Sequence, residues 1–278
     1  MSDGLTQGPI GVFDSGYGGL TVFREILDEL PDYDYIYLGD NARTPYGTRS
    51  LDTVYEFTLQ GVRHLFAQGC HLVILACNTA SANALRRIQQ VDLPRETDEK
   101  RVLGVIRPTT ERLHELTKTG HLGICATEAT VQSMSYVIEA EKYAPDVTIH
   151  QQACPMWVPI VENDEQDSPA AGYYSKKYIE RLMAQHDDID AVLLACTHYP
   201  ILREKILEHL PDEVQLISQG SLVAASLKDY LRRHAWLEEK CAKGGKLRFQ
   251  TTDSTEDFDT KASKYFGRSV DSEHVTIS

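Results

Sequence analysis

Short, uninterrupted apolar runs alternate along the chain with longer stretches of mixed apolar and polar residues. Runs such as LVIL and AVLLA are typical of strands buried on both faces of a parallel sheet, and the longer stretches between them read as helices. The pattern predicts strands at residues 10–14, 35–39, 72–76, 102–106, 122–125, 148–152, 191–195, 214–217 and 247–250. It predicts helices at residues 19–30, 51–67, 80–91, 109–117, 129–143, 170–186, 201–210, 221–237 and 256–266.

This alternation of strands and helices predicts an α/β fold with doubly wound parallel sheets. A chain of 278 residues can form one large or two medium domains with a sufficient core. The polar stretch 94–100 and the pair Pro211-Asp212 are candidate linkers. We therefore expect an outer α/β domain formed by residues 1–98 and 212–278, with a second α/β domain, residues 99–211, inserted into it.

The overall charge narrows the range of partners. A net charge of −13 argues against a broad nucleic-acid or anionic-membrane surface. No apolar run reaches the ~18 residues that a membrane span needs, and no stretch resembles a signal peptide. A cytoplasmic protein is expected. The six cysteines show no C-x-x-C pair and no tight zinc spacing, so we expect free thiols and no metal.

Polar clusters follow several of the predicted strands, where open α/β sheets bind their ligands. The clusters are Asp14-Ser15-Gly16, Pro45-Tyr46-Gly47, Cys77-Asn78-Thr79, Thr127-Glu128-Ala129-Thr130 and Cys196-Thr197-His198. They contain hydroxyls and an amide but no lysine or arginine, and helix N-termini can hold carboxylates without a formal cation. Because Asp14 can complement an ammonium group, these clusters suit a small zwitterion with extra negative charge, such as an acidic amino acid.

Two of these clusters carry a thiol. Cys77 and Cys196 each follow an apolar run, each precede a helix, and lie 119 positions apart (196 − 77), one in each half of the chain. Inversion at a carbon needs one group to remove a proton from one face and another to deliver a proton to the opposite face. A cysteine at a strand end is otherwise most often a small buried hydrophobe, and that interpretation is kept for Cys70, Cys125, Cys154 and Cys241.

Five segments together resemble the glutamate racemases of the cofactor-independent amino-acid racemase superfamily. They are GVFDSGYGGLTV, YLGDNARTPYG, ACNTASA, ACPMWVPIVE and ACTHYPIL, and the matching region as a whole runs from Gly11 to about Gln219. The resemblance implies two similar α/β domains with the active site in the cleft between them. It also implies interconversion of L- and D-glutamate without cofactor or metal, supplying D-glutamate for peptidoglycan. A homodimer is the expected assembly.

The resemblance also implies roles for individual residues. Cys77 and Cys196 match the catalytic acid/bases, facing D- and L-glutamate respectively, and Asp14, Glu162 and His198 match the polar groups that support them. The substrate-holding positions match Asp14, Ser15, Tyr46, Gly47, Asn78, Thr79, Thr127, Thr197 and His198. The chain departs from the family's usual pattern at Ala195, Gln219 and the pair Glu128-Ala129.

Several alternatives stay open at this point. Asp14 can simply cap the following helix, His198 can be a structural hydrogen-bonding residue, and Glu162 can belong to a solvated acidic run. The glycines that follow Asp14 lack the Rossmann spacing. No lysine in the motifs can hold pyridoxal phosphate, which favours direct proton transfer. An aspartate racemase, a related isomerase and a non-catalytic amino-acid-binding protein are the alternative functions.

Overall fold

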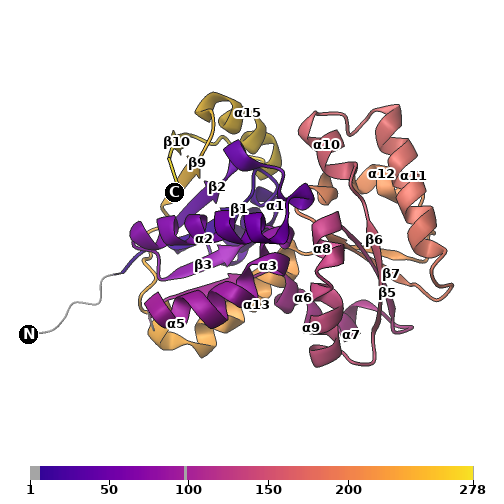
Figure 1. The fold of residues 1–278 in the computed structure, drawn as a ribbon, viewed down its shortest axis with the longest axis horizontal. Helices are drawn as coiled ribbons and strands as arrows, with labels where there is room; N and C mark the ends of the chain where they lie inside the picture. Colours follow the sequence, from indigo (N-terminus) through magenta and orange to yellow (C-terminus); the bar gives the residue numbers. More distant parts are fainter. Residues whose placement is uncertain (1–6, 97–98, 278) are drawn as a thin grey trace, which may run out of the picture.

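The computed structural model describes residues 7–96 and 99–277, which form two parallel sheets side by side (Figure 1). The six-stranded sheet has the order β10 (Ser272–His274), β9 (Leu247–Thr251), β2 (Tyr35–Gly39), β1 (Ile10–Asp14), β3 (Leu72–Leu75) and β4 (Arg101–Gly104). The four-stranded sheet has the order β6 (Thr148–Ala153), β5 (His121–Ala126), β7 (Ala191–Ala195) and β8 (Gln215–Ser218). Every strand pair is parallel. The predicted α/β class with parallel sheets is confirmed.

Helices cover both faces of the six-stranded sheet, which explains its continuous apolar strands. Val12 packs with α1 (Leu20–Glu29), α13 (Gly220–Arg233) and α15 (Thr255–Phe266), whereas its neighbour Phe13 packs with α2 (Leu51–Ala67). Successive side chains of a strand point to opposite faces, so burial on both faces requires apolar residues at consecutive positions. Although α13 and α15 come late in the chain, they lie with this N-terminal sheet (Figure 1).

The four-stranded sheet is covered in the same way. Ile124 packs with α9 (Ser135–Tyr143), and Cys125 packs on the other face with α11 (Pro169–Met183). The remaining helices are α3 (Asn78–Asn83), α4 (Leu85–Arg87), α5 (Leu93–Glu96), α6 (Ile106–Thr110), α7 (Leu113–Leu116), α8 (Glu128–Gln132), α10 (Trp157–Glu162), α12 (Arg203–Leu207) and α14 (Ala235–Glu238). Short 3₁₀ turns cover Asn41–Arg43, Tyr46–Thr48 and Tyr199–Leu202, and a π-helical turn covers Ile88–Asp92.

Sheet membership corrects the predicted domain limits. Strand β4 pairs with β3, so residues 101–104 belong to the first sheet rather than to the inserted unit. Strand β8 pairs with β7, so residues 215–218 belong to the second sheet rather than to the outer unit. The polar stretch 94–100 indicated a boundary, but the apolar Val102 and Leu103 behind it complete the first sheet. The chain therefore crosses between the sheets after β4 and after β8, and the division into two domains stays a prediction with these limits.

Other differences from the predicted elements have local causes. The helix predicted at 129–143 is interrupted at Met134, whose φ of 54° is outside the helical region. Strand β10 was not predicted because its sequence, Ser-Glu-His, is short and polar. Helix α10 was missed because Pro159 lies in its middle. Among the described residues, none of the helices combines the length and apolar character needed to cross a bilayer.

Candidate active site

Loops at the carboxyl ends of strands from both sheets enclose a small cavity of about 50 Å³. Its lining residues are Ser15, Thr44, Pro45, Tyr46, Gly47, Thr48, Cys77, Asn78, Thr79, Thr127, Glu128, Cys154, Pro155, Val158, Pro159, Cys196, Thr197 and His198. Both candidate thiols are in its wall, and within the described ranges no lysine or arginine lines it. A larger cavity of about 830 Å³, between α4, α6, α9 and α13, contains none of the predicted site residues. The small cavity is therefore the candidate site.

Cys77 stands between β3 and α3 as the N-cap residue of that helix. Its Sγ accepts a hydrogen bond from the backbone N–H of Ala80 (3.4 Å) and lies 3.5 Å from Ser15 Oγ. Burial, helped by the nearby Asp14 carboxylate, raises the pKa of Cys77 to about 12, while the contacts with Ser15 and Ala80 oppose this rise. Cys77 is therefore a neutral thiol near pH 7, ready to give a proton.

Cys196 has a different environment, dominated by His198. The Nδ1 atom of His198 lies 3.9 Å from Cys196 Sγ, and its Nε2 atom lies 3.3 Å from Glu162 Oε1. Burial alone lowers the pKa of His198, but the hydrogen bonds and charges of Cys196 and Glu162 outweigh it and raise that pKa to about 10. The imidazole is thus protonated near pH 7 and places a positive charge beside the sulfur of Cys196. The imidazole thus lies between the Glu162 carboxylate and the Cys196 sulfur, although its Nε2 atom makes no hydrogen bond among the described residues.

Asp14 lies behind the cavity wall and is not among its lining residues. Its side chain is fully buried, and its Oδ2 atom accepts a hydrogen bond from the Gly16 N–H at 2.9 Å. Burial raises the pKa of Asp14, and the charge of His198 opposes that shift. Helix α1 begins without a side-chain cap, so Asp14 does not act as the N-cap of that helix. The contact of Asp14 with a substrate ammonium group stays a prediction.

Two motif glycines permit the close approach of loops from the two sheets. A Cβ atom on Gly18 would lie 2.3 Å from Thr197 Oγ1 and 2.6 Å from His198 Nδ1. A Cβ atom on Gly47 would lie 3.0 Å from the Cβ of Thr127. Any larger residue would push these loops apart, so the glycines keep both halves of the cavity together.

Threonine and asparagine side chains bridge the halves. Thr79 Oγ1 lies 3.0 Å from Thr127 Oγ1. Both ends of the Asn78 side-chain amide are hydrogen-bonded inside the protein. Its Oδ1 atom accepts from Tyr136 Oη (2.7 Å), and its Nδ2 atom donates to Gln219 Oε1 (2.8 Å). The side chain of Asn78 is therefore a fixed part of the wall. Tyr136 and Gln219 were not predicted as site residues. Gln219 directly follows β8, a position at which α/β sheets commonly bind their ligands.

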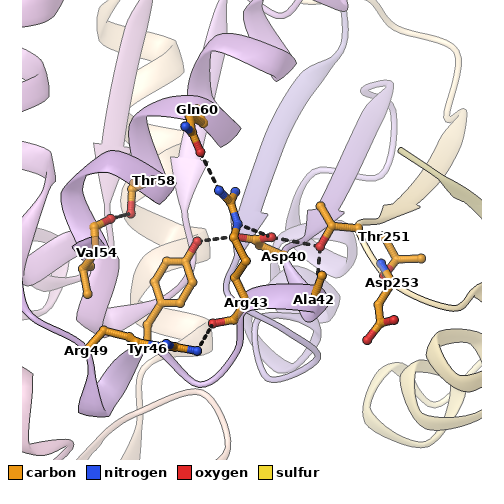
Figure 2. A network of polar contacts seen from close by, with 11 residues as sticks. Asp40, Ala42, Arg43, Tyr46, Arg49, Val54, Thr58, Gln60, Thr251 and Asp253 are labelled. Carbon is orange, nitrogen blue, oxygen red and sulfur yellow. Dashed lines mark hydrogen bonds and ion pairs between the residues drawn. The ribbon is translucent and has the colours of Figure 1, made fainter. Parts of the chain in front are cut away.

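The loop that carries Pro45-Tyr46-Gly47 is anchored on Asp40 (Figure 2). Arg43 pairs with this buried carboxylate, its Nε atom 2.7 Å from Asp40 Oδ2, and the hydroxyl of Tyr46 donates to the same oxygen. Thr252 Oγ1 donates to the other oxygen at 2.9 Å. Because the Tyr46 hydroxyl is used here, this residue presents its ring and backbone to the cavity. Asp40 was not predicted, although it follows the end of β2.

The structure gathers most of the predicted residues at one place. Lining residues that were predicted are Ser15, Tyr46, Gly47, Cys77, Asn78, Thr79, Thr127, Cys196, Thr197 and His198, whereas Asp14 and Glu162 stand behind them. Thr44 was not predicted, yet it lines the cavity and its Oγ1 atom lies 3.5 Å from Glu162 Oε1. Cys154, also unpredicted, lines the cavity with its thiol directed to the Gln152 carbonyl.

Two parallel α/β units that face a shared cavity, with Cys77 from one and Cys196 from the other, define a racemase-like class of α/β protein. The model of the Asp/Glu/Hydantoin racemase family matches residues 10–227, and the chain belongs to this family. It is 41% identical to the glutamate racemase of Paracoccus denitrificans (strain Pd 1222), over 92% of this chain and 96% of that protein.

Solved structures agree with this assignment. The glutamate racemase isoform RacE1 of Bacillus anthracis superposes with a TM-score of 0.87 at 33% identity and covers 97% of both chains. The glutamate racemase of Francisella tularensis, solved in complex with D-glutamate, gives a TM-score of 0.84 at 32% identity, covering 97% of this chain and 98% of that one.

Proposed function

We propose that this chain interconverts L- and D-glutamate by proton transfer between its two thiols and the α-carbon, supplying D-glutamate for peptidoglycan. The observation that carries the proposal is the pair Cys77 and Cys196 in one cavity, in electrostatically different environments. Similarity to glutamate racemases over nearly the whole chain supports glutamate as the substrate.

The two thiols act in sequence on opposite faces of the α-carbon. With L-glutamate, the Cys196 thiolate, held beside protonated His198, removes the α-proton. The neutral Cys77 thiol then delivers its own proton to the opposite face, which gives D-glutamate and leaves Cys77 as the thiolate. One proton leaves the substrate and one returns, so no redox partner is required. The reverse reaction begins from Cys77. The starting state is restored when Cys196 gives up the proton that it has taken to solvent and Cys77 receives one from solvent or Asp14.

Substrate carboxylates are held by neutral donors in this proposal. The hydroxyls of Ser15, Thr79 and Thr197 line the cavity. The first N–H groups of a helix lack intrahelical acceptors, so α3 offers donors beside Cys77. Donors of this kind also stabilise the negative charge that develops when the α-proton leaves. A dry, closed cavity strengthens each of these interactions.

The test of this function is an assay with both enantiomers of glutamate and of aspartate in deuterated water. We expect each glutamate enantiomer to exchange its α-hydrogen for deuterium and to reach an equal mixture of the two forms. Faster turnover of aspartate would favour the alternative of an aspartate racemase. Binding of glutamate without exchange would instead identify a non-catalytic amino-acid-binding protein.

Two expectations from the sequence belong to the same proposal. A homodimer is expected, and light scattering of the purified protein at several concentrations measures its mass directly. A cytoplasmic location is also expected, and cell fractionation tests it.

A further inference from the structure

Three histidines lie together at the end of the four-stranded sheet opposite the cavity. His121 is the first residue of β5, His150 lies in β6, and His186 lies in the loop that follows α11. One ring nitrogen from each lies within 4.8 Å of the others, and all three side chains are half-buried. They are widely separated in sequence, so no spacing rule could have detected them.

The strand register explains why these side chains meet. His150 is paired with Gly123, two residues after His121, so both histidines are on the same face of the sheet. A Cβ on Gly123 would touch Leu182 of α11, which identifies this face as the one that α11 covers. His186 follows the end of α11 and therefore arrives at the same place. The backbone alone thus brings three imidazoles together.

The rings are arranged around a common centre. His121 Nδ1 lies 3.1 Å from His150 Nε2. The ring of His186 stacks on that of His121 with a centroid distance of 3.8 Å, and its centroid lies 5.3 Å from that of His150. Asp188 is the nearest acidic partner, with its Oδ2 atom 3.8 Å from His186 Nδ1. Asp190 is occupied elsewhere, accepting from the backbone N–H groups of Lys118 and Thr119.

We propose that His121, His150 and His186 form a binding site for a divalent transition-metal ion, with Zn²⁺ as its preferred occupant. Three imidazole nitrogens with one open position are a known zinc ligand set, and the Zn–N distance of about 2.0–2.1 Å separates tetrahedral ligands by roughly 3.3 Å. The 3.1 Å between His121 Nδ1 and His150 Nε2 is close to that separation. His186 has only to turn from its stack with His121, which its position in a loop permits.

Asp188, which lies beside His186, can orient that imidazole as a metal ligand. His186 Nδ1 accepts a hydrogen bond from the backbone N–H of Asp188 at 3.2 Å. Binding through Nε2 would place the proton on Nδ1, and the ring would exchange that hydrogen bond for one donated to the Asp188 carboxylate, 3.8 Å away, the arrangement that orients metal-bound imidazoles. Water completes the coordination. The ion would fasten the loop after α11 to β5 and β6.

The site lies far from the proton-transfer chemistry. It occupies the amino-terminal ends of β5 and β6, whereas the cavity lies beyond the carboxyl ends of the strands. The metal therefore has a structural role, and removing it should leave glutamate racemisation unchanged. The inference is independent of the proposed function for this reason.

Calorimetric titration of the full chain, freed of any affinity tag and of bound metal, with Zn²⁺ tests the site. We expect one equivalent to bind per chain and the unfolding temperature to rise with Zn²⁺ concentration. His186→Ala should weaken binding by at least about tenfold, while His114→Ala, a change at an exposed histidine on α7, should leave it unchanged. No binding by the parent chain, or equal binding by His186→Ala, overturns the proposal and leaves a stacked, hydrogen-bonded histidine group.

A second variant and a spectroscopic probe guard against misfolding. His150→Gln should also lose the metal, and its far-ultraviolet circular dichroism and metal-free unfolding temperature report whether it is folded. Co²⁺ bound to the parent chain should give the visible absorption bands of a tetrahedral nitrogen site, and these bands should be absent from folded His150→Gln. Bands that persist in that variant contradict the assignment.

Discussion

His198 is the basic residue of the site, and its pKa lies well above the ordinary value for histidine. The stability of the folded chain therefore depends on pH through this residue. Its pKa in the folded chain is about 10, against an unfolded value of ~6.5. Because the folded state binds this proton more tightly, the stabilisation is complete below pH ~6.5, declines as the pH rises, and is lost once the pH passes about 10.

We therefore predict a difference between the parent chain and His198→Gln. Urea unfolding across pH 6 to 10.5 should show the parent losing several kcal/mol more than the variant over this window. Taking the difference between the two proteins removes the contribution of tyrosines and lysines that titrate in both. Parallel stability curves would mean that His198 is neutral in the folded chain.

Asp14 is the second residue whose role a substitution can define. In Asp14→Asn, the side-chain oxygen can still accept from the Gly16 N–H, so we expect unfolding to change by at most ~1–2 kcal/mol. An amide cannot exchange a proton with Cys77, so turnover should fall more than about tenfold. Steady-state kinetics and chemical unfolding of the same preparation provide the measurement. Unchanged turnover would reduce Asp14 to a structural hydrogen-bond acceptor.

At the scale of elements, the site depends on loops from the two sheets lying in contact. Gly18→Ala would place a methyl group 2.3 Å from Thr197 Oγ1 and 2.6 Å from His198 Nδ1. We predict a loss of roughly 1–3 kcal/mol in stability. Displacing His198 and Cys196 by a fraction of an ångström to 1 Å should lower kcat by up to about 100-fold.

Gly172→Ala is the matched control for this prediction. A Cβ at Gly172, on α11, would meet nothing within 4 Å. Replacing a helical glycine by alanine should raise stability by roughly 0.5–1 kcal/mol and leave kcat unchanged. If Gly18→Ala has the same kcat as this control, the close contact of the two loops is not required for catalysis.

The elements differ in how far the sequence could predict them. Strands β1, β2 and β7 match their predicted limits because each is an unbroken apolar run ended by a polar residue or glycine loop. Helix α10, which carries Glu162, could not be predicted from periodicity because Pro159 interrupts it. Glu162 was found only through the resemblance of its motif, and its contact with His198 depends on how two distant segments pack.

The residues that line or support the cavity were also only partly predictable from the sequence. Ser15, Cys77 and Cys196 were predictable because each lies within two residues of the end of a strand, and the carboxyl ends of parallel strands share one edge. Asp40 and Gln219 occupy equivalent positions but lacked a chemical reason to be selected. Their partners, Arg43 for Asp40 and Asn78 for Gln219, are revealed only by the packed structure. The histidine group shows this most clearly, because its members come from three separate elements.

The whole molecule places a small cavity between two α/β units. A cavity of about 50 Å³ is well below the roughly 300 Å³ at which ordinary ligand pockets begin, so this is a closed state that must open to admit glutamate. We expect an opening motion to separate the two thiols and closing to bring them back on either side of the α-carbon. Such motion also excludes water while protons are transferred.

The chemistry of the cavity predicts activity without a cofactor. No lysine lines it to form a Schiff base among the described residues, and its thiols act directly on the substrate in the proposed mechanism. Activity should survive exhaustive chelation and borohydride treatment, even if chelation removes an ion from the histidine group. Loss of activity on chelation that one metal restores would contradict this account.

The most direct test of the two-thiol mechanism is the racemisation rate in both directions for Cys77→Ser and Cys196→Ser. A serine hydroxyl is a far weaker acid than a thiol, so each variant should lose at least about 100-fold in both directions. Glutamate should still bind, because neither change removes a carboxylate donor. Each variant should exchange the α-hydrogen only of the enantiomer that faces its remaining thiol. If either folded variant racemises glutamate within about tenfold of the parent rate, that cysteine is not an obligatory base and the account is wrong.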